Sequence, residues 1–380
     1  MLERIAAEGL DVLAELIRIV INTAMQAERQ QYLQAGPYER TPQRDYANGY
    51  KPKTVNTRVG QIAFAVPQER EGQFYPDALE KGLRSERALT LALAEMYVQG
   101  VSTRKVAAIT EQLCGTAISS TQVSQAAAQL DEVLAAWRER PLGLFPYLYL
   151  DARYEKVRQD GQAREAAVLL AAGADQHGQR QILGVSVSLS EQEVHWRTFL
   201  QSLVERGLQG VQLIISDAHA GLQQARRAAF GGVPWQRCQF HLQHNASAYV
   251  PRQAMKAEVA ADIRAIFNAP DRPMAEALLD QIVRKYAKKA ARLAEWLEHN
   301  LPEGLTVFAI PAPHRRRIRT TNGLERVSQE IRRRTRVVRI FPNEASCLRL
   351  VSALLMEISE EWETGRRYLT FEGAQEIVTP

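Results

Sequence analysis

Three acidic residues, Asp151, Asp217 and Glu325, have the chemistry and the sequence context to hold divalent metal ions. Asp151 ends the run Pro146-Tyr-Leu-Tyr-Leu-Asp151 within an expected strand, and Asp217 ends the apolar run that starts at Val211, directly after another expected strand. Carboxylate oxygens bind Mg²⁺, and two metal ions about 3.5–4 Å apart can clamp the attacking and leaving oxygens of a phosphodiester. We therefore predict that these three residues are catalytic and bind the metal, with Mg²⁺ as cofactor and Mn²⁺ as its substitute.

The elements around the two aspartates have an order that brings them together. Apolar alternation and the turn signal Asp160-Gly161 predict three consecutive antiparallel strands at 147–158, 165–174 and 181–189. The pattern then predicts a helix at 193–206, a strand at 211–216, a helix at 219–230 and a strand at 234–240. The order β-β-β-α-β-α-β is that of a ribonuclease H-like core, in which the fourth strand lies beside the first. Asp151 and Asp217 are then expected to be neighbours.

Glu325 is expected on a helix that starts at Asn322 and is dense in positive charge. Residues 315–339 contain ten arginines against two acidic residues, Glu325 and Glu330. A charge run is usually a solvated face, and Arg326 and Glu330 have the spacing to pair along a helix. Because this density adjoins the expected metal site, we predict a DNA phosphate track made of Arg326, Arg332, Arg333, Arg334 and Arg336.

The rest of the chain completes an α/β fold class: a ribonuclease H-like core with a helical insertion before the catalytic glutamate, preceded by a mostly helical DNA-binding region. The predicted segments are an N-terminal helix at 1–40, a small β-rich segment at 41–84, a helix-turn-helix-like DNA-binding domain at 85–145, the first part of the catalytic core at 146–241, the helical insertion at 242–304, and the second part of the core, with the Glu325 helix and a C-terminal helix, at 305–380.

Short local signals refine these segments. Asn48-Gly49 and Val59-Gly60 indicate turns between β-favouring runs, and residues 311–319 read as a basic loop. Ser119, followed by Gln122 three residues later, is a capping box that starts a helix. Because a helix after a short glycine-containing turn is a common DNA-reading element, we predict that Ser120 and Gln122 contact DNA.

Composition indicates a multidomain protein of a reducing compartment. Its 380 residues are 46% hydrophobic, and Lys and Arg (48) exceed Asp and Glu (43) by 5. Three scattered cysteines, Cys114, Cys238 and Cys347, are too few for a disulfide framework. Acidic and basic residues interrupt the N-terminal apolar stretch, and no apolar run approaches the ~20 residues that cross a bilayer. We expect a cytoplasmic protein with no membrane partner.

Several long motifs resemble the Mutator-type transposases of bacterial insertion sequences. They are the runs Leu150-Asp-Ala-Arg-Tyr-Glu-Lys-Val-Arg158, Ser216-Asp-Ala-His-Ala-Gly-Leu222, Cys238-Gln-Phe-His241, Thr321-Asn-Gly-Leu-Glu-Arg326, Ile331-Arg-Arg-Arg-Thr-Arg-Val-Val338 and Phe341-Pro-Asn343, together with the N-terminal runs Tyr38-Glu-Arg-Thr41 and Asn48-Gly-Tyr-Lys51. The resemblance covers nearly the whole chain. It implies a DDE transposase with a ribonuclease H-like core and carries the catalytic roles onto Asp151, Asp217 and Glu325. Ser328 and Arg339 stand where the family pattern has Asn and Gly.

Cys238 and His241 admit two interpretations. A zinc site normally needs four ligands, and His244 is the only further candidate close by in the sequence. In the resembled family this Cys–His pair is characteristic and lies near the catalytic centre. We therefore expect Cys238 and His241 to support the active site, without zinc.

Together these features predict a transposase that binds the terminal inverted repeats of its element and cuts phosphodiester bonds with water as nucleophile. The freed 3′-hydroxyl then attacks a second phosphodiester in target DNA. Double-stranded DNA is the expected partner, and the need to join two ends implies at least a homodimer. The resemblance further implies a copy-out route through a circular intermediate. The alternatives are a ribonuclease H-like metal-dependent nuclease or resolvase without strand transfer, and a DNA-binding regulator with inert carboxylates.

Overall fold

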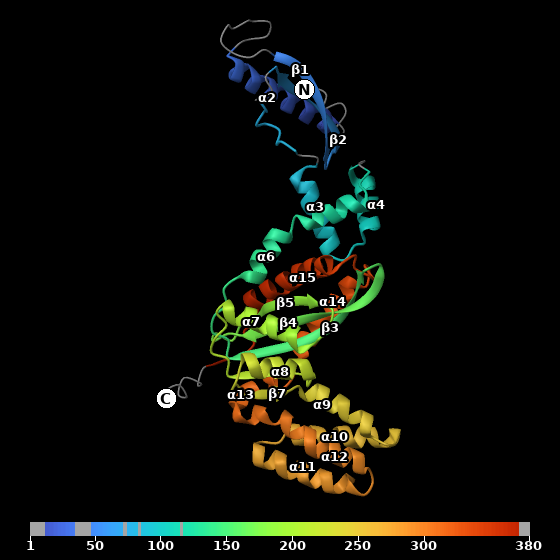
Figure 1. Ribbon diagram of the computed structural model, residues 1–380, viewed down its shortest axis with the longest axis vertical. Coiled ribbons are helices and arrows are strands. Elements are labelled where there is room, and N and C mark those ends of the chain that lie inside the picture. Colours follow the sequence, from blue (N-terminus) through green and yellow to red (C-terminus); the bar gives the residue numbers. More distant parts are fainter. Residues whose placement is uncertain (1–11, 35–46, 71–73, 83–84, 115–116, 372–380) are drawn as a thin grey trace. The chain divides into compact units, whose positions relative to one another are not determined.

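The computed structural model describes residues 12–34, 47–70, 74–82, 85–114 and 117–371. The chain divides into two compact units, residues 1–130 and residues 131–380, and each is described by itself. Figure 1 labels their helices and strands. Among the described residues, every helix is too short or too polar to span a lipid bilayer.

A helix and a hairpin open the first unit. Helix α2 packs on the antiparallel hairpin around buried Met25, Ile62 and Phe64, with bounds α2 Leu13–Leu33, β1 Ala47–Thr57 and β2 Gly60–Glu69. The predicted hairpin is confirmed, but Asn48-Gly49 is not a turn. Gly49 has φ 71° and lies inside β1, where the strand register shifts between Ala47 and Tyr50. Residues 1–11 and 35–46, which include both ends of the predicted N-terminal helix, lie outside the described residues.

Three helices complete the first unit: α3 (Arg87–Val98), α4 (Thr103–Cys114) and α5 (Ser120–Ala128). Their contact surface buries Leu89, Val106 and Val123. The predicted capping box is confirmed. The Gln122 backbone N–H donates to Ser119 Oγ at 3.2 Å, and the Ser119 N–H donates to Gln122 Oε1 at 2.8 Å. The start of α5 is therefore set by two local hydrogen bonds.

A five-stranded sheet in the order β5-β4-β3-β6-β7 is the centre of the second unit. The strands are β3 (Tyr147–Gln159), β4 (Gln162–Ala174), β5 (Arg180–Ser188), β6 (Leu213–Ser216) and β7 (Trp235–Arg237). Strands β3, β4 and β5 are antiparallel neighbours, and Asp160 and Gly161 make the first turn with φ 50° and 78°. Strand β6 lies parallel to β3, which confirms that the strands of the two aspartates are adjacent.

Helices cover both faces of this sheet (Figure 1). One face packs its apolar side chains, including Leu148, Leu150 and Leu169, against α7 (Glu193–Glu205) and α8 (Ala220–Ala229). The other face carries α14 (Asn322–Thr335) and α15 (Glu344–Thr364). The Asn343 side chain accepts a hydrogen bond from the Ser346 N–H at 2.8 Å and so caps the start of the last helix.

Helix α6 (Asp131–Glu139) belongs to the second unit, although the sequence suggested a DNA-binding domain that extended to residue 145. The cause is tertiary, because Arg349 of α15 pairs with Asp131 at 2.6 Å and Arg138 donates to Ser352 at 3.0 Å. The unit boundary therefore precedes α6.

Residues 239–310 are helical, as predicted for 242–304, and follow β7 in the chain. They contain α9 (Gln239–Ala246), α10 (Lys256–Phe267), α11 (Arg272–Ala287), α12 (Ala291–Asn300) and the short 3-10 turns η4 (Leu301–Gly304) and η5 (Thr306–Ala309). The prediction of a basic loop at 311–319 is wrong, because this segment forms α13 (Ala312–Ile318). Pro311 and Pro313 fall at its N-terminal end, where a missing N–H costs no helical hydrogen bond.

A buried glutamine joins the last strand to the turns that follow α12. The Gln236 side chain is fully buried in β7, donates to the Gly304 carbonyl at 2.8 Å and accepts from the Val307 N–H at 2.6 Å. A buried backbone group that loses its partner costs about 1–3 kcal/mol. This single side chain therefore stabilises the junction between the sheet and residues 301–309.

We predict that Gln236→Leu lowers the free energy of unfolding by about 2–4 kcal/mol, because leucine has nearly the same size but leaves the Val307 N–H without its partner. Urea unfolding followed by circular dichroism measures this change. The matched control is Gln201→Leu at an exposed position of α7, which should shift stability by less than about 0.5 kcal/mol. Equal effects of the two substitutions would show that the Gln236 hydrogen bonds contribute nothing.

Candidate active site

Asp151 lies on the polar side of β3. Side chains alternate along a strand, so Asp151, Arg153 and Glu155 share the face that α14 covers. The Arg153 guanidinium donates to the Ser328 carbonyl of α14, and Glu155 accepts from Thr335 Oγ1 at 3.1 Å. Arg153 also pairs with Glu155 at 2.5 Å. These contacts fix α14 along β3.

The lengths of β3 and α14 agree with this alignment of the helix along the strand. Four residues of strand, from Asp151 to Glu155, advance about 13 Å, and ten residues of helix, from Glu325 to Thr335, advance about 15 Å. Because Thr335 meets Glu155 at one end, the first turn of α14 lies level with Asp151. The glutamate thus reaches the aspartate through the docking of a whole helix on a strand.

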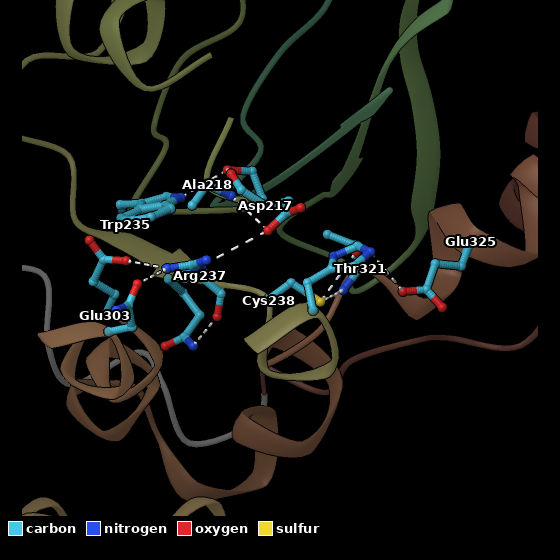
Figure 2. Close-up of polar contacts among 12 residues, drawn as sticks. Asp217, Ala218, Trp235, Arg237, Cys238, Glu303, Thr321 and Glu325 are labelled. Atoms are coloured by element: carbon cyan, nitrogen blue, oxygen red, sulfur yellow. Dashed lines mark hydrogen bonds and ion pairs between the residues drawn. The ribbon is translucent and has the colours of Figure 1, made fainter. Parts of the chain in front are cut away.

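Glu325 is directed into the site rather than into solvent. Its side chain is 25% exposed, and Oε1 lies 3.8 Å from His241 Nε2 (Figure 2). This oxygen is buried without a hydrogen-bond partner among the described residues. Burial raises the pKa of Glu325 above its usual value, and His241 opposes that shift. A buried carboxylate oxygen without a donor is suited to a cation.

Asp217 follows β6 directly and is held by its neighbour in the sheet. Its Oδ1 accepts from the Ala218 N–H at 2.8 Å and lies 3.9 Å from Arg237 Nε. Arg237 ends β7, pairs with Ser216 in register and binds Glu303 at 2.9 Å (Figure 2). The sequence analysis missed Arg237; its place at the end of the next strand was the available signal.

Cys238 and His241 lie beside the carboxylates. Cys238 precedes α9 and is fully buried, and the Thr321 N–H and hydroxyl each donate to its sulfur at 3.4 Å. His241 is one helical turn further along α9. Burial acts to raise the pKa of the Cys238 thiol, but hydrogen bonds and charge from His241, with Thr321, outweigh it and lower the pKa.

His241 links this cysteine to all three carboxylates. Its hydrogen bond with Cys238, together with the charges of Cys238, Asp217 and Asp151, raises the pKa of His241 to about 9 against the effect of burial. Glu325 is the third acidic neighbour, at 3.8 Å. The protonated imidazole therefore supplies positive charge at the centre of the acidic cluster.

The three carboxylates are close enough to repel one another. Burial raises the pKa of Asp151 to about 7, and the charges of Glu325 and Asp217 add to the shift, whereas His241 and the Ala152 N–H oppose it. Repulsion of this kind is relieved by a bound cation. Asp151, Asp217 and Glu325 supply the oxygen donors that hard divalent ions prefer, and Glu325 Oε1 has no hydrogen-bond partner among the described residues. Of the three, only Glu325 belongs to the described donor group whose ligand atoms lie within 4.8 Å of one another.

A second donor combination overlaps the first. The ligand atoms of Cys238, His241 and Glu325 lie within 4.8 Å of one another. The exposed His244 is not part of this group in the described residues, so a fourth protein ligand for zinc is missing there. The absence of zinc from the pair stays a prediction.

The predicted phosphate track is not uniform. Arg326, Arg332 and Arg336 are exposed. Arg333 and Arg334 instead pair with Glu330, at 2.7 and 2.8 Å, and lower the pKa of Glu330 to about 2. Arg334 is also buried, with Glu357 of α15 at 3.8 Å. The contact of all five arginines with DNA stays a prediction. The ion pairs make Arg333, although exposed, and the buried Arg334 weaker candidates than Arg326, Arg332 and Arg336.

The pairing of Arg326 with Glu330 that the spacing suggested is replaced by the pairs of Glu330 with Arg333 and Arg334.

In the first unit, Gln122 is exposed and Ser120 is half-buried. The Gln122 amide oxygen is engaged in the capping box at 2.8 Å, which leaves its NH₂ group for a DNA contact. Both residues remain predicted DNA contacts.

Comparisons with known proteins identify the family of the chain. A family model described as "Transposase, Mutator family" matches residues 2–365. The chain is 60% identical over 366 residues to the transposase for insertion sequence element IS406 of Burkholderia multivorans, covering 96% of this chain and 94% of that protein. It is 45% identical over 368 residues to the transposase for ISRM5 of Rhizobium meliloti, covering 96% and 92%.

The transposase for IS256 in transposon Tn4001 of Staphylococcus aureus is 38% identical over 372 residues, covering 95% of this chain and 94% of that protein. The protein is thus a transposase, an enzyme that cleaves DNA and transfers its strands. The chain belongs to the Mutator family, as the sequence motifs predicted.

We predict that Arg334→Gln lowers the free energy of unfolding by about 1–3 kcal/mol, because it removes a buried partner of Glu330 and Glu357. Chemical denaturation measures this loss. The control is the exposed Arg332→Gln, which should change stability by less than about 0.5 kcal/mol. A destabilisation by Arg332→Gln that matches the one by Arg334→Gln would contradict the division of the arginines.

We predict that Cys238→Ser and His241→Gln slow DNA cleavage and that purified protein contains no stoichiometric zinc. The reason is that the pair sets charge and position beside Glu325 through hydrogen bonds. Elemental analysis and cleavage assays test both statements. Cys347→Ser replaces another fully buried cysteine outside this group, so it should cost stability but leave the rate of the folded protein intact. One zinc per chain, lost in both site variants, would overturn the prediction.

Proposed function

We propose that this transposase uses a DDE two-metal mechanism on a ribonuclease H-like core. The single observation that supports it most is the docking of α14 on β3, which sets Glu325 level with Asp151, while the parallel neighbour β6 leads directly into Asp217. The strand order β5-β4-β3-β6-β7 supports the ribonuclease H-like assignment, since the fourth strand of the unit lies beside the first. Residues 239–310 would then be the helical insertion.

Asp151, Asp217 and Glu325 would hold two Mg²⁺ ions, with Mn²⁺ as a substitute. Bound divalent ions would activate the attacking oxygen and stabilise the leaving oxygen of a phosphodiester. The protein keeps its carboxylates in place beforehand: Arg237 holds Asp217, and the contact of Arg153 with the Ser328 carbonyl holds the helix of Glu325. Preplaced charges need no rearrangement during the reaction.

The reaction would proceed in two displacements of the same kind. Water attacks a phosphodiester at the element end and releases a 3′-hydroxyl, which then attacks a phosphodiester of the target DNA. No covalent bond between protein and DNA is required. We further propose that α4 and α5 of the first unit bind the terminal inverted repeats. Because two ends must be joined, the working form would be at least a homodimer.

The carboxylates are tested by Asp151→Asn, Asp217→Asn and Glu325→Gln, made one at a time. Each should abolish Mg²⁺-dependent nicking of duplex DNA that carries the element ends, because an amide is a poor metal ligand. Each should bind that DNA at least as tightly as the unaltered protein, because a negative charge near the phosphates is removed. Nicking on sequencing gels and binding by fluorescence anisotropy provide the two measurements.

The matched control is Asp160→Asn in the β3–β4 turn, where φ is 50° and asparagine fits as well as aspartate. It changes the same group on the same hairpin and should cleave normally. Full nicking by any of the three site variants would remove that residue from the proposed triad. Cleaved ends that never join target DNA would instead indicate a nuclease without strand transfer.

A further inference from the structure

A hollow of about 530 Å³ lies beside the first turn of α14 and is rich in arginine. Four arginines line it: Arg180 from the start of β5, Arg316 and Arg317 from α13, and Arg326 from α14. The carboxylates that line it, within the described part of the chain, are Glu330 and Glu361. Since Glu330 is already bound by Arg333 and Arg334, the hollow carries excess positive charge.

Arg180 is held rigidly at the wall of this pocket. Its guanidinium carbon lies 4.1 Å from the Trp362 ring centroid and 4.2 Å from that of Tyr368. Tyr368 is itself anchored, because its N–H donates to the Gly178 carbonyl at 2.7 Å and its hydroxyl donates to the Arg317 carbonyl at 2.8 Å. A guanidinium between two rings keeps its planar fork of donors in one orientation.

The backbone of α14 leaves room for this guanidinium. A side chain at Gly323 would place its Cβ 3.2 Å from Arg180 Nη1. Burial lowers the pKa of Arg180, and the charges of Arg317 and Arg326 lower it further. Like charges gathered in this way are stabilised by a shared anion, and paired guanidinium donors match phosphate oxygens.

The pocket adjoins the carboxylate site. Arg326 follows Glu325 directly in α14. A smaller hollow next to the pocket, shared by Arg180 and Tyr368, is walled by Tyr149. Tyr149 and Asp151 are two residues apart on the same face of β3, about 7 Å along the strand. The arginine pocket is thus connected to the sheet face of Asp151 through Tyr149 and the first turn of α14.

We propose that the pocket of Arg180, Arg316, Arg317 and Arg326 binds a backbone phosphate of the DNA strand that is cut, next to the reacting phosphodiester. This inference rests on the proposed function of the carboxylate site. Trp362 and Tyr368 have their faces on Arg180, so the pocket binds the backbone and does not stack a base. Its contribution is therefore independent of DNA sequence.

The test uses the full chain and a fluorescent duplex of random sequence, bound at several salt concentrations. The variants are Arg180→Gln and the double variant Arg316→Gln/Arg317→Gln. Each lost phosphate contact should reduce the slope of log affinity against log salt by about 0.9. The matched control, Arg284→Gln, removes an exposed arginine of α11 away from the pocket lining and should leave the slope unchanged.

The double variant keeps the test valid if Arg180→Gln fails to fold, because Arg316 and Arg317 are exposed. If the salt-dependence slope of the double variant equals that of Arg284→Gln, the proposal that this pocket binds a DNA phosphate is rejected. A different result would favour a free anion over DNA as the ligand of the pocket. In that case inorganic phosphate would protect the unaltered protein but not the double variant from thermal unfolding, and DNA binding would be the same in both. Unaltered protein that neither binds nor cuts DNA would contradict the proposed function itself.

Discussion

The burial of polar side chains on one face of β3 is the constraint on which the active site depends. Asp151, Arg153 and Glu155 lie on a sheet face that α14 covers, and polar groups removed from water must find partners there. Arg153 donates a hydrogen bond to the Ser328 carbonyl, and Glu155 accepts one from the Thr335 hydroxyl. These contacts select one register of helix on strand, and that register sets Glu325 level with Asp151. The contacts that hold α14 on β3 therefore also determine where Glu325 lies relative to Asp151.

The three carboxylates of the site repel one another, and nearby positively charged groups partly offset this repulsion. Burial raises the pKa of Asp151 to about 7, and the charges of Glu325 and Asp217 add to the shift, which indicates that the protein does not fully balance the negative charge. His241 supplies positive charge beside the carboxylates. It is hydrogen-bonded to Cys238, whose sulfur in turn accepts from the Thr321 hydroxyl. Arg237 balances Asp217 from the neighbouring strand. A remaining deficit of positive charge of this kind is relieved by a cation.

Features governed by neighbouring residues were predictable from the sequence, and features governed by distant partners were not. The Asp160-Gly161 turn, the Ser119 capping box and the parallel placement of β6 beside β3 follow from local chemistry and element order. Helix α13 was missed, although Pro311 at its N-cap and Pro313 in its first turn are both compatible with the start of a helix. The pairing of Arg334 with Glu357 depends on the docking of α15, which no local spacing indicates.

The arginines around Glu325 illustrate why composition alone misjudges a basic segment. A guanidinium paired with carboxylates has already exchanged water for a protein partner, and moving it to a phosphate would leave those carboxylates unpaired. Arg333 and Arg334 are in that state, with Glu330 between them. Arg180, Arg316, Arg317 and Arg326 instead converge on open space. The arginines that remain available to an anion are therefore distinguished by where their counter-ions lie, and the rings around Arg180 fix the direction of its guanidinium.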